Sequence, residues 1–403
     1  MKKIMFFGLT LLALGSALFA DDAKVMPKFV GRFYLVPTFS FANGEYDNDG
    51  KYQSFGGTAK VFNLGAALEF GITDWITGAV QWTPGWTAYS DISPAAPAGV
   101  QSLMPLLTNG ALAGTDKNFK GDLTVNGVAD LFVGAKIQIV GEKAPVQTGM
   151  FRFSVAPGLT IPLPGPDFSD EANNAMKDDT AAFASMDKHV LGLGGRVYFD
   201  YIINEHFFIN LYNETLVYPI KQKLDKDGPN LALLRKTVLQ TAQDVVDSPM
   251  PLPVPGEIAM AMATDLTNKL DGDVNYKYRL TFELEPQFST PFGGGAFSFS
   301  AGLPLHYVYN PAPDYTVNGL DDLLGGLSQL MGAVPITKSD LLKQAQLTGE
   351  DSHILSINPN VSMFMYKTPL PLEFKLQYNL PLWGQNAQAT NSVVFQVKAY
   401  FQI

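Results

Sequence analysis

The sequence predicts an all-β fold: a transmembrane antiparallel up-and-down β-barrel of about twelve strands, with helical segments in long extracellular loops. Apolar and polar residues alternate from residue 28 to the end of the chain, in segments as long as a tilted membrane strand requires. The connections between these segments are alternately long and short. After residue 20 no run of about 18 apolar residues occurs, although 46% of the chain is hydrophobic and only 16% is charged. Strands rather than spanning helices must therefore carry the apolar surface.

Residues 1–20 have the pattern of a secretory signal peptide. Lys2 and Lys3 precede an apolar run, and small residues precede Ala20, after which we expect cleavage. A retained membrane anchor is the alternative, but the apolar run is short for a span and no stop-transfer pattern follows it. We expect residues 21–403 to form a barrel in the outer membrane of a diderm bacterium.

Composition argues against several kinds of site. The chain has no cysteine, so it offers neither a disulfide nor a thiolate metal site. Its formal net charge of −10 argues against a nucleic-acid partner. The sequence contains no phosphate-binding loop and no carboxylate–histidine metal motif. We therefore expect neither a metal nor a cofactor.

The first predicted strand, residues 29–41, shows the alternation clearly. Phe33, Leu35 and Phe39 share one face, and Arg32 and Tyr34 lie on the other. In a membrane barrel the apolar face meets lipid and the opposite face lines the lumen. The same rule predicts the other strands at residues 60–72, 75–85, 122–140, 149–162, 189–202, 205–219, 273–288, 294–308, 352–366, 370–383 and 391–403.

The connections distinguish a membrane barrel from a soluble sandwich. Short turns are predicted near residues 73–74, 141–145, 204–205, 290–293 and 368–369. Loops are predicted at 42–59 and 384–390 and, as large outer loops, at 86–121, 163–188, 220–272 and 309–351. An outer-membrane barrel has short periplasmic turns, long external loops and an even strand number that places both termini in the periplasm. A soluble β-sandwich has no reason to alternate its connections, and its outward faces are polar.

The last predicted strand alternates up to the final residues. Val393 and Phe401 lie on its apolar face, and Lys398 lies on the other. Closure of a barrel pairs the last strand with the first, which explains this regularity better than an ordinary edge strand does. An alternating C-terminal strand with aromatic residues also resembles the signal recognised by the outer-membrane assembly machinery, here with Ile403 in place of the usual Phe.

Two neighbouring stretches resemble a known group of barrels. Gly127–Lys136, GVADLFVGAK, is followed at residues 154–164 by SVAPGLTIPLP. Over residues 60–202 the chain resembles outer-membrane transporters of the phenol-degradation-pathway type, and its layout is more distantly similar to the long-chain fatty acid transporters. The resemblance implies passage of small hydrophobic molecules. The short segment between Ala20 and the first strand leaves no room for the N-terminal plug of the fatty acid transporters.

Charged residues on the inward faces are the candidate lumen-lining residues. Rings of a single sign would indicate ion selectivity, whereas the mixed signs found here indicate ion pairs that cross and narrow the lumen. These residues either fill the lumen in this way or contact a permeating solute directly. They are Arg32, Glu69, Asp130, Lys136, Arg152, Arg196, Asp200, Glu214, Lys277, Arg279, Glu283, Glu285, Glu373, Lys375 and Lys398.

The two largest loops contain apolar residues at helical spacing. Residues 230–246, 257–270, 319–331 and 339–347 place Leu, Val and Met on one side. Such helices either pack on each other over the barrel mouth, fold into the lumen, or bind a hydrophobic ligand. The candidate apolar residues are Leu233, Leu234, Val238, Met260, Met262, Leu323, Leu324 and Leu327.

The predicted function is that of an outer-membrane channel or transporter for passive passage of small hydrophobic or amphipathic molecules. Its expected partners are outer-membrane lipid, a small-molecule substrate and the assembly machinery. The alternative is a surface-exposed barrel, adhesin or structural, that transports nothing. An enzyme is not predicted, because a barrel lipase needs a paired Ser and His. None of His189, His206, His306 and His353 has a Ser two positions on.

Overall fold

The computed structural model describes residues 22–90, 125–163, 184–185, 190–224, 229–247, 254–331, 337–344 and 347–403. The predicted signal peptide lies outside these residues, as do most of the predicted loops 86–121 and 163–188.

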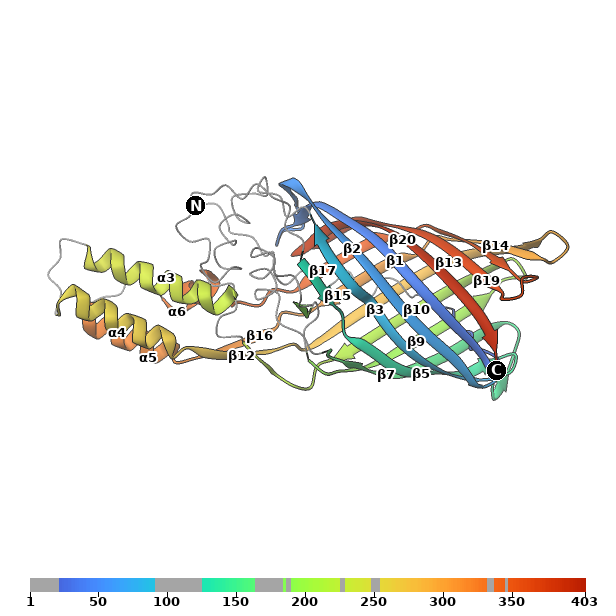
Figure 1. Ribbon diagram of the computed structural model, residues 1–403, viewed down its shortest axis with the longest axis horizontal. Helices are drawn as coiled ribbons and strands as arrows, with labels where there is room; N and C mark the ends of the chain where they lie inside the picture. The colour runs from blue at the N-terminus through green and yellow to red at the C-terminus, as the bar shows by residue number, and fades with distance from the viewer. Residues whose placement is uncertain are drawn as a thin grey trace.

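The strands close into a 12-strand antiparallel barrel, as the sequence predicted (Figure 1). Three passes are each split into two strands, two of them next to a proline, which cannot donate to a ladder. Two short strands, β6 (Val146–Gln147) and β8 (Ala184–Ser185), add parallel pairs to the wall. In order around the barrel the passes are β1 (Val30–Tyr46), β2 (Tyr52–Thr73), β3 (Ile76–Ser90), β4 with β5 (Val125–Val128, Leu131–Gly141), β7 (Phe151–Ile161), β9 (Gly192–Ile202), β10 (Phe207–Val217), β13 (Tyr278–Phe292), β14 with β15 (Phe297–Gly302, Leu305–Asn310), β17 with β18 (Ser352–Ile357, Asn360–Met365), β19 (Leu372–Gln385) and β20 (Ala387–Gln402).

Side chains of β1 show how alternation orients the wall. Phe33, Leu35 and Phe39 are 41%, 39% and 43% exposed, whereas Arg32 and Tyr34 are buried. The apolar side chains therefore cover the outside, where a membrane barrel meets lipid. Pairing of every barrel pass with two neighbours satisfies the backbone polar groups that hydrocarbon cannot.

The barrel closes where β1 pairs with β20, from Val30 opposite Gln402 to Tyr46 opposite Ala387. Gly31 lies opposite Phe401, and a Cβ on this glycine would lie 2.2 Å from a carbon of the Phe401 ring. The aromatic residue near the chain end thus covers a glycine of the first strand.

We expect Gly31→Val to lower the yield of folded barrel, because the new side chain occupies the space of the Phe401 ring at the closing seam. Overpacking of this kind costs about 1–3 kcal/mol. The measurement is the fraction of refolded protein whose gel mobility changes on boiling. Gly149→Val is the matched control, since nothing lies within 4 Å of a Cβ there. Equal folded yields for the two variants would show that the seam tolerates the added bulk.

Two predicted loops, 42–59 and 384–390, are wrong because the flanking strands continue through most of each. Asp47 closes the first hairpin by accepting hydrogen bonds from the Asp49 and Lys51 backbone N–H groups, both at 2.9 Å. The Lys51 N–H contributes most to holding the pKa of Asp47 below its usual range. The polar composition of these ends suggested loops, but polar side chains beyond the lipid do not prevent backbone pairing.

A separate three-stranded sheet, the stalk, extends from the end of the barrel opposite the short turns (Figure 1). It consists of β11 (Gln222–Lys223), β12 (Asp271–Asn275) and β16 (Asp314–Asn318). The single strand predicted at 273–288 is therefore wrong at its start: β12 lies in the stalk and β13 in the barrel. Period-two alternation does not identify the sheet to which a strand belongs.

The four helices of the described residues form a module beyond the stalk, away from the barrel (Figure 1). They are α3 (Pro229–Val246), α4 (Gly256–Asn268), α5 (Leu320–Met331) and α6 (Lys338–Gln344). They pack on each other around a core that includes the fully buried Leu234, Leu323 and Leu341. Arg235 of α3 donates to the Thr267 carbonyl oxygen at 3.1 Å, which satisfies an acceptor at the end of α4. None of the described helices is long and apolar enough to cross a membrane.

Candidate functional site

A chain of buried polar side chains, the crossbar, runs through the barrel interior from Glu373 through Arg32, Glu69, Tyr34, Gln81 and Arg196 to Glu214. Arg32 of β1 and Glu69 of β2 are direct cross-strand neighbours and form an ion pair, with each side chain 7% exposed. The Tyr34 hydroxyl donates to Glu69 at 2.8 Å, and the Gln81 amide donates to Tyr34 at 3.1 Å. Strand alternation places all of them on the inner face.

Arg196 carries the crossbar across the lumen. Its guanidinium donates to the Gln81 amide oxygen at 2.7 Å, although β5 and β7 separate β3 from β9 in the wall. The same guanidinium pairs with Glu214 of β10 and lies 3.9 Å from the centre of the Phe132 ring. Tyr212 donates to Glu214 at 3.0 Å. The contact between Arg196 and Gln81 joins strands that are not neighbours in the wall. It therefore passes through the interior and narrows the lumen.

Glu373 forms the other end of the crossbar. It accepts hydrogen bonds from Lys398 at 3.1 Å and from the Tyr400 hydroxyl at 2.7 Å. The Arg32 guanidinium lies 5.9 Å from the centre of the Tyr400 ring, which connects this end to the rest. Opposite charges alternate along the crossbar, and such pairing offsets the cost of removing each charge from water.

The sequence identified the charged members of the crossbar and Tyr34 as inward-facing. Its candidate lumen residues did not include Tyr34, Gln81 or the two tyrosines, Tyr212 and Tyr400, that donate to the glutamates at the two ends of the crossbar. A search restricted to charges left them out.

A second buried group lies on the opposite wall. Glu285 of β13 accepts from Asn210 at 3.2 Å and from Asn360 at 2.9 Å. Glu283 lies 2.9 Å from Nδ1 of His306, and both side chains are almost fully buried. Among the described residues, the second Glu283 oxygen and Nε2 of His306 have no hydrogen-bond partner. These atoms leave capacity for water or for a polar group of a solute.

Two more predicted cations, Lys375 of β19 and Arg279 of β13, lie in barrel strands. Nε and Nη2 of Arg279 are buried without a hydrogen-bond partner among the described residues. Arg279 therefore adds donors to the unpaired atoms of this wall.

Two predicted lumen residues lie just outside the barrel strands. Lys277 precedes β13 and forms an ion pair with Asp314 of the stalk at 3.0 Å, because the barrel strand begins after it. Asp130 lies in the break between β4 and β5, where it accepts from the Leu163 backbone N–H at 3.4 Å.

His306 lies between Glu283 and Ser356 on neighbouring strands, the residue order of a hydrolytic triad. Local spacing in the sequence could not show this arrangement, because each residue comes from a different strand. Nε2 of His306 nevertheless donates to and accepts from no described residue, so no hydrogen bond to Ser356 activates its hydroxyl.

We expect the parent protein and a His306→Ala variant to hydrolyse a short-chain nitrophenyl ester at the same background rate. A spectrophotometric assay of both refolded barrels measures the difference. A rate that depends on His306 would restore the lipase alternative.

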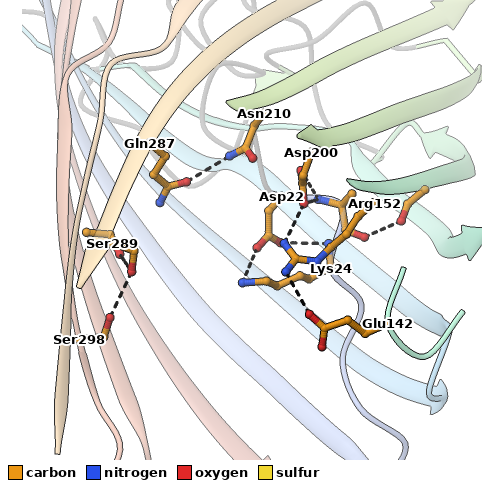
Figure 2. Close-up of polar contacts among 12 residues, drawn as sticks. Asp22, Lys24, Glu142, Arg152, Asp200, Asn210, Gln287, Ser289 and Ser298 are labelled. Atoms are coloured by element: carbon orange, nitrogen blue, oxygen red, sulfur yellow. Dashed lines mark hydrogen bonds and ion pairs between the residues drawn. The ribbon is translucent and has the colours of Figure 1, made fainter. Parts of the chain in front are cut away.

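The remaining predicted lumen residues gather near the short turns. Arg152 pairs with Asp200 at 3.4 Å and with Glu142 at 3.6 Å (Figure 2). Lys136 donates to main-chain carbonyl oxygens of the segment Asp22–Lys28, here named the arm, which lies inside the barrel against these strands. The sequence left no room for the plug of the fatty acid transporters, and this much shorter segment enters the lumen instead.

The candidate apolar residues of the loops lie in the helical module. Leu234, Val238 and Leu323 belong to its buried core, and Met260 and Leu324 pack against that core. Met262 is 46% exposed. The side chains of Leu233 and Leu327 lie outside the part of the chain that the structure describes. Ligand binding by these residues stays a prediction.

Within the described residues, no three His, Asp or Glu side chains converge in a way that could hold a metal ion.

No protein-family profile and no curated protein sequence matches the chain. Among solved structures, an outer membrane channel from Pseudomonas putida F1 aligns with a TM-score of 0.53 at 12% identity, over 95% of this chain and 100% of that chain. The P. putida toluene transporter TodX aligns with a TM-score of 0.36 at 10% identity, over 100% of this chain and 99% of that chain. A Pseudomonas aeruginosa FadL homologue aligns with a TM-score of 0.31 at 9% identity, over 93% of this chain and 90% of that chain. The first likeness confirms the outer-membrane barrel fold.

Proposed function

We propose that this barrel is an outer-membrane channel for the passive passage of small hydrophobic or amphipathic molecules. The observation that carries the proposal is the crossbar, which lines a narrow interior with paired charges and tyrosines. A tyrosine offers an apolar ring face beside a hydroxyl, which suits a molecule with an apolar body and one polar group. Paired charges of both signs give a free ion no selective attraction.

The proposed passage is diffusion down a concentration gradient. A solute enters from the stalk side, which we take as external, and exchanges contacts with the unpaired atoms of Glu283, His306 and Arg279. It then passes the crossbar as the side chains rotate. In this proposal the chain is exported with a signal peptide that is then cleaved. The strand β20 is recognised for assembly of the barrel in the outer membrane.

Efflux from vesicles that contain lipopolysaccharide tests the proposal. Vesicles with the refolded barrel are loaded with a small uncharged phenol or with a zwitterion of similar size. We expect the barrel to accelerate release of the phenol over protein-free vesicles, and to accelerate release of the zwitterion less. Equal rates with and without the barrel for both solutes would contradict the proposal.

A non-transporting surface protein is the second candidate, and the helical module favours it. The module stands off the barrel on the stalk (Figure 1) and exposes Ile258 and Met262 of α4 at 50% and 46%. A folded barrel that passes neither ions nor solutes, with the module intact, would move this candidate ahead.

A further inference from the structure

We propose that the inner wall of β5, β7 and β9 is a peptide-binding seat for the arm, Asp22–Lys28, and that the arm is a displaceable plug at the short-turn end of the lumen. The inference deepens the proposed function and rests on it, because it concerns regulation of the same lumen. The barrel closes through β1 and β20, so closure of the fold does not depend on the arm.

The seat binds the main chain of one arm residue completely. The Ala23 N–H donates to both carboxylate oxygens of Asp200, at 2.9 and 3.0 Å. The Ala23 carbonyl oxygen accepts from the Gln138 amide at 3.0 Å and from the Ser154 hydroxyl. Side chains from three strands thus satisfy both main-chain polar groups of a single residue. A preformed binding site recognises an extended peptide in the same way.

The seat also limits the size of the side chain that it accepts. Ala23 is fully buried and packs with Ala156, Tyr198 and Tyr212. A larger residue has no space there without displacement of a wall side chain. The arm also lies close to the wall at Pro27. A Cβ on Gly71 would lie 2.0 Å from the Pro27 carbonyl oxygen, so only glycine fits at position 71 beside the arm.

Two further hydrogen bonds hold the C-terminal part of the arm to side chains of the wall and of the first short turn. The Met26 N–H donates to the Thr77 hydroxyl at 2.7 Å, and the Lys28 N–H donates to Asp74 in the first short turn at 3.1 Å. The arm belongs to no ladder of the sheet. A neutral hydrogen bond contributes about 0.5–1.5 kcal/mol net and one to a carboxylate about 1.5–3 kcal/mol. The barrel strands do not depend on these bonds, so the arm can leave while the barrel remains intact.

A cavity separates the arm from the crossbar. It is lined by Lys24 and Met26 of the arm and by Glu69, Gln81 and Arg196 of the crossbar, among others. The arm and the crossbar therefore lie in series along the lumen. When the arm leaves, this cavity opens toward the short turns.

The first test locks the arm in the full chain. Because the chain has no cysteine, Met26→Cys with Thr77→Cys introduces one unique pair where the Met26 N–H lies 2.7 Å from the Thr77 hydroxyl oxygen, and neither substitution enlarges a side chain. We expect the oxidised protein to show no channel openings in a planar bilayer, and reduction to restore the parent's openings. Identical currents before and after reduction, with the disulfide verified by mass, would overturn the plug.

The second test supplies the arm in trans. A variant lacking residues 22–27 is refolded and checked for heat-modifiable mobility, and we expect severalfold higher conductance than the parent. An acetylated, fluorescently labelled peptide of the sequence DAKVMPK is expected to bind the variant and return its conductance toward that of the parent. The same peptide with Trp at the position of Ala23 is the matched control and is expected to do neither.

The outcomes separate the two proposals. Binding of the parent peptide but not of the Trp peptide, in a variant without ion current, supports the seat and contradicts the channel. Ion current that is unaffected by arm deletion or by either peptide supports the channel and overturns the plug.

Discussion

Arg196→Met is expected to raise the conductance of the barrel severalfold and to destabilise it. The substitution removes the contact of β9 with Gln81 of β3, which crosses the lumen, and leaves Glu214 without its ion-pair partner. Glu214 is 3% exposed, and breaking a buried pair from one side typically costs about 3–5 kcal/mol. Water in the lumen reduces this cost, so we expect the lower end. Urea unfolding followed by tryptophan fluorescence measures it.

The double variant Arg196→Met/Glu214→Gln separates the two effects. It removes the unpaired charge, so we expect most of the stability to return while the conductance stays high. Arg196→Lys, which keeps the charge but loses the forked donor, is expected to fall between the parent and Arg196→Met. If the double variant conducts like the parent, Arg196 does not restrict the lumen and the crossbar has only a structural role.

Leu323→Asp is expected to unfold the helical module while the barrel stays folded. Leu323 is fully buried in the core shared by the four helices, and a charge there has no partner. Truncation of a buried Leu alone costs about 2–5 kcal/mol, and a buried carboxylate adds to that. We expect loss of the helical circular-dichroism signal with unchanged heat-modifiable mobility.

The same variant tests whether the helices control the lumen. Because the module stands beyond the stalk (Figure 1), we expect Leu323→Asp to leave single-channel conductance unchanged. Ile258→Asp, on the exposed face of α4, is the matched control for charge and is expected to preserve both helicity and conductance. Larger current steps in Leu323→Asp alone would show instead that the folded module covers the barrel mouth.

The barrel was predictable because lipid and lumen impose opposite demands on alternate residues. Phe33 and Arg32, adjacent in β1, are directed to opposite faces by the pleat alone. Strand ends were less predictable, since the residues around Asp47 are polar in a strand as in a loop. The stalk was missed because β12 and β13 both alternate, although they belong to different sheets.

The inward charges were predictable as a set, but their partners were not. The contact of Arg196 with Gln81 depends on the curvature of the wall, which brings β9 toward β3 across the interior. The arm carries no periodicity that marks it, and Ala23 is chemically unremarkable in the sequence. Asp200, Gln138 and Ser154 come from three different strands. They can bind the main chain of Ala23 only after those strands have assembled.

Single-channel recording of the parent barrel, in a bilayer with lipopolysaccharide on one side, tests the central claim most directly. The account predicts small discrete current steps that are interrupted when a small uncharged phenol is added, and that a zwitterion of similar size leaves unchanged. Silence of a heat-modifiable, fully inserted barrel, both as the parent and as the Arg196→Met/Glu214→Gln variant, would contradict the account.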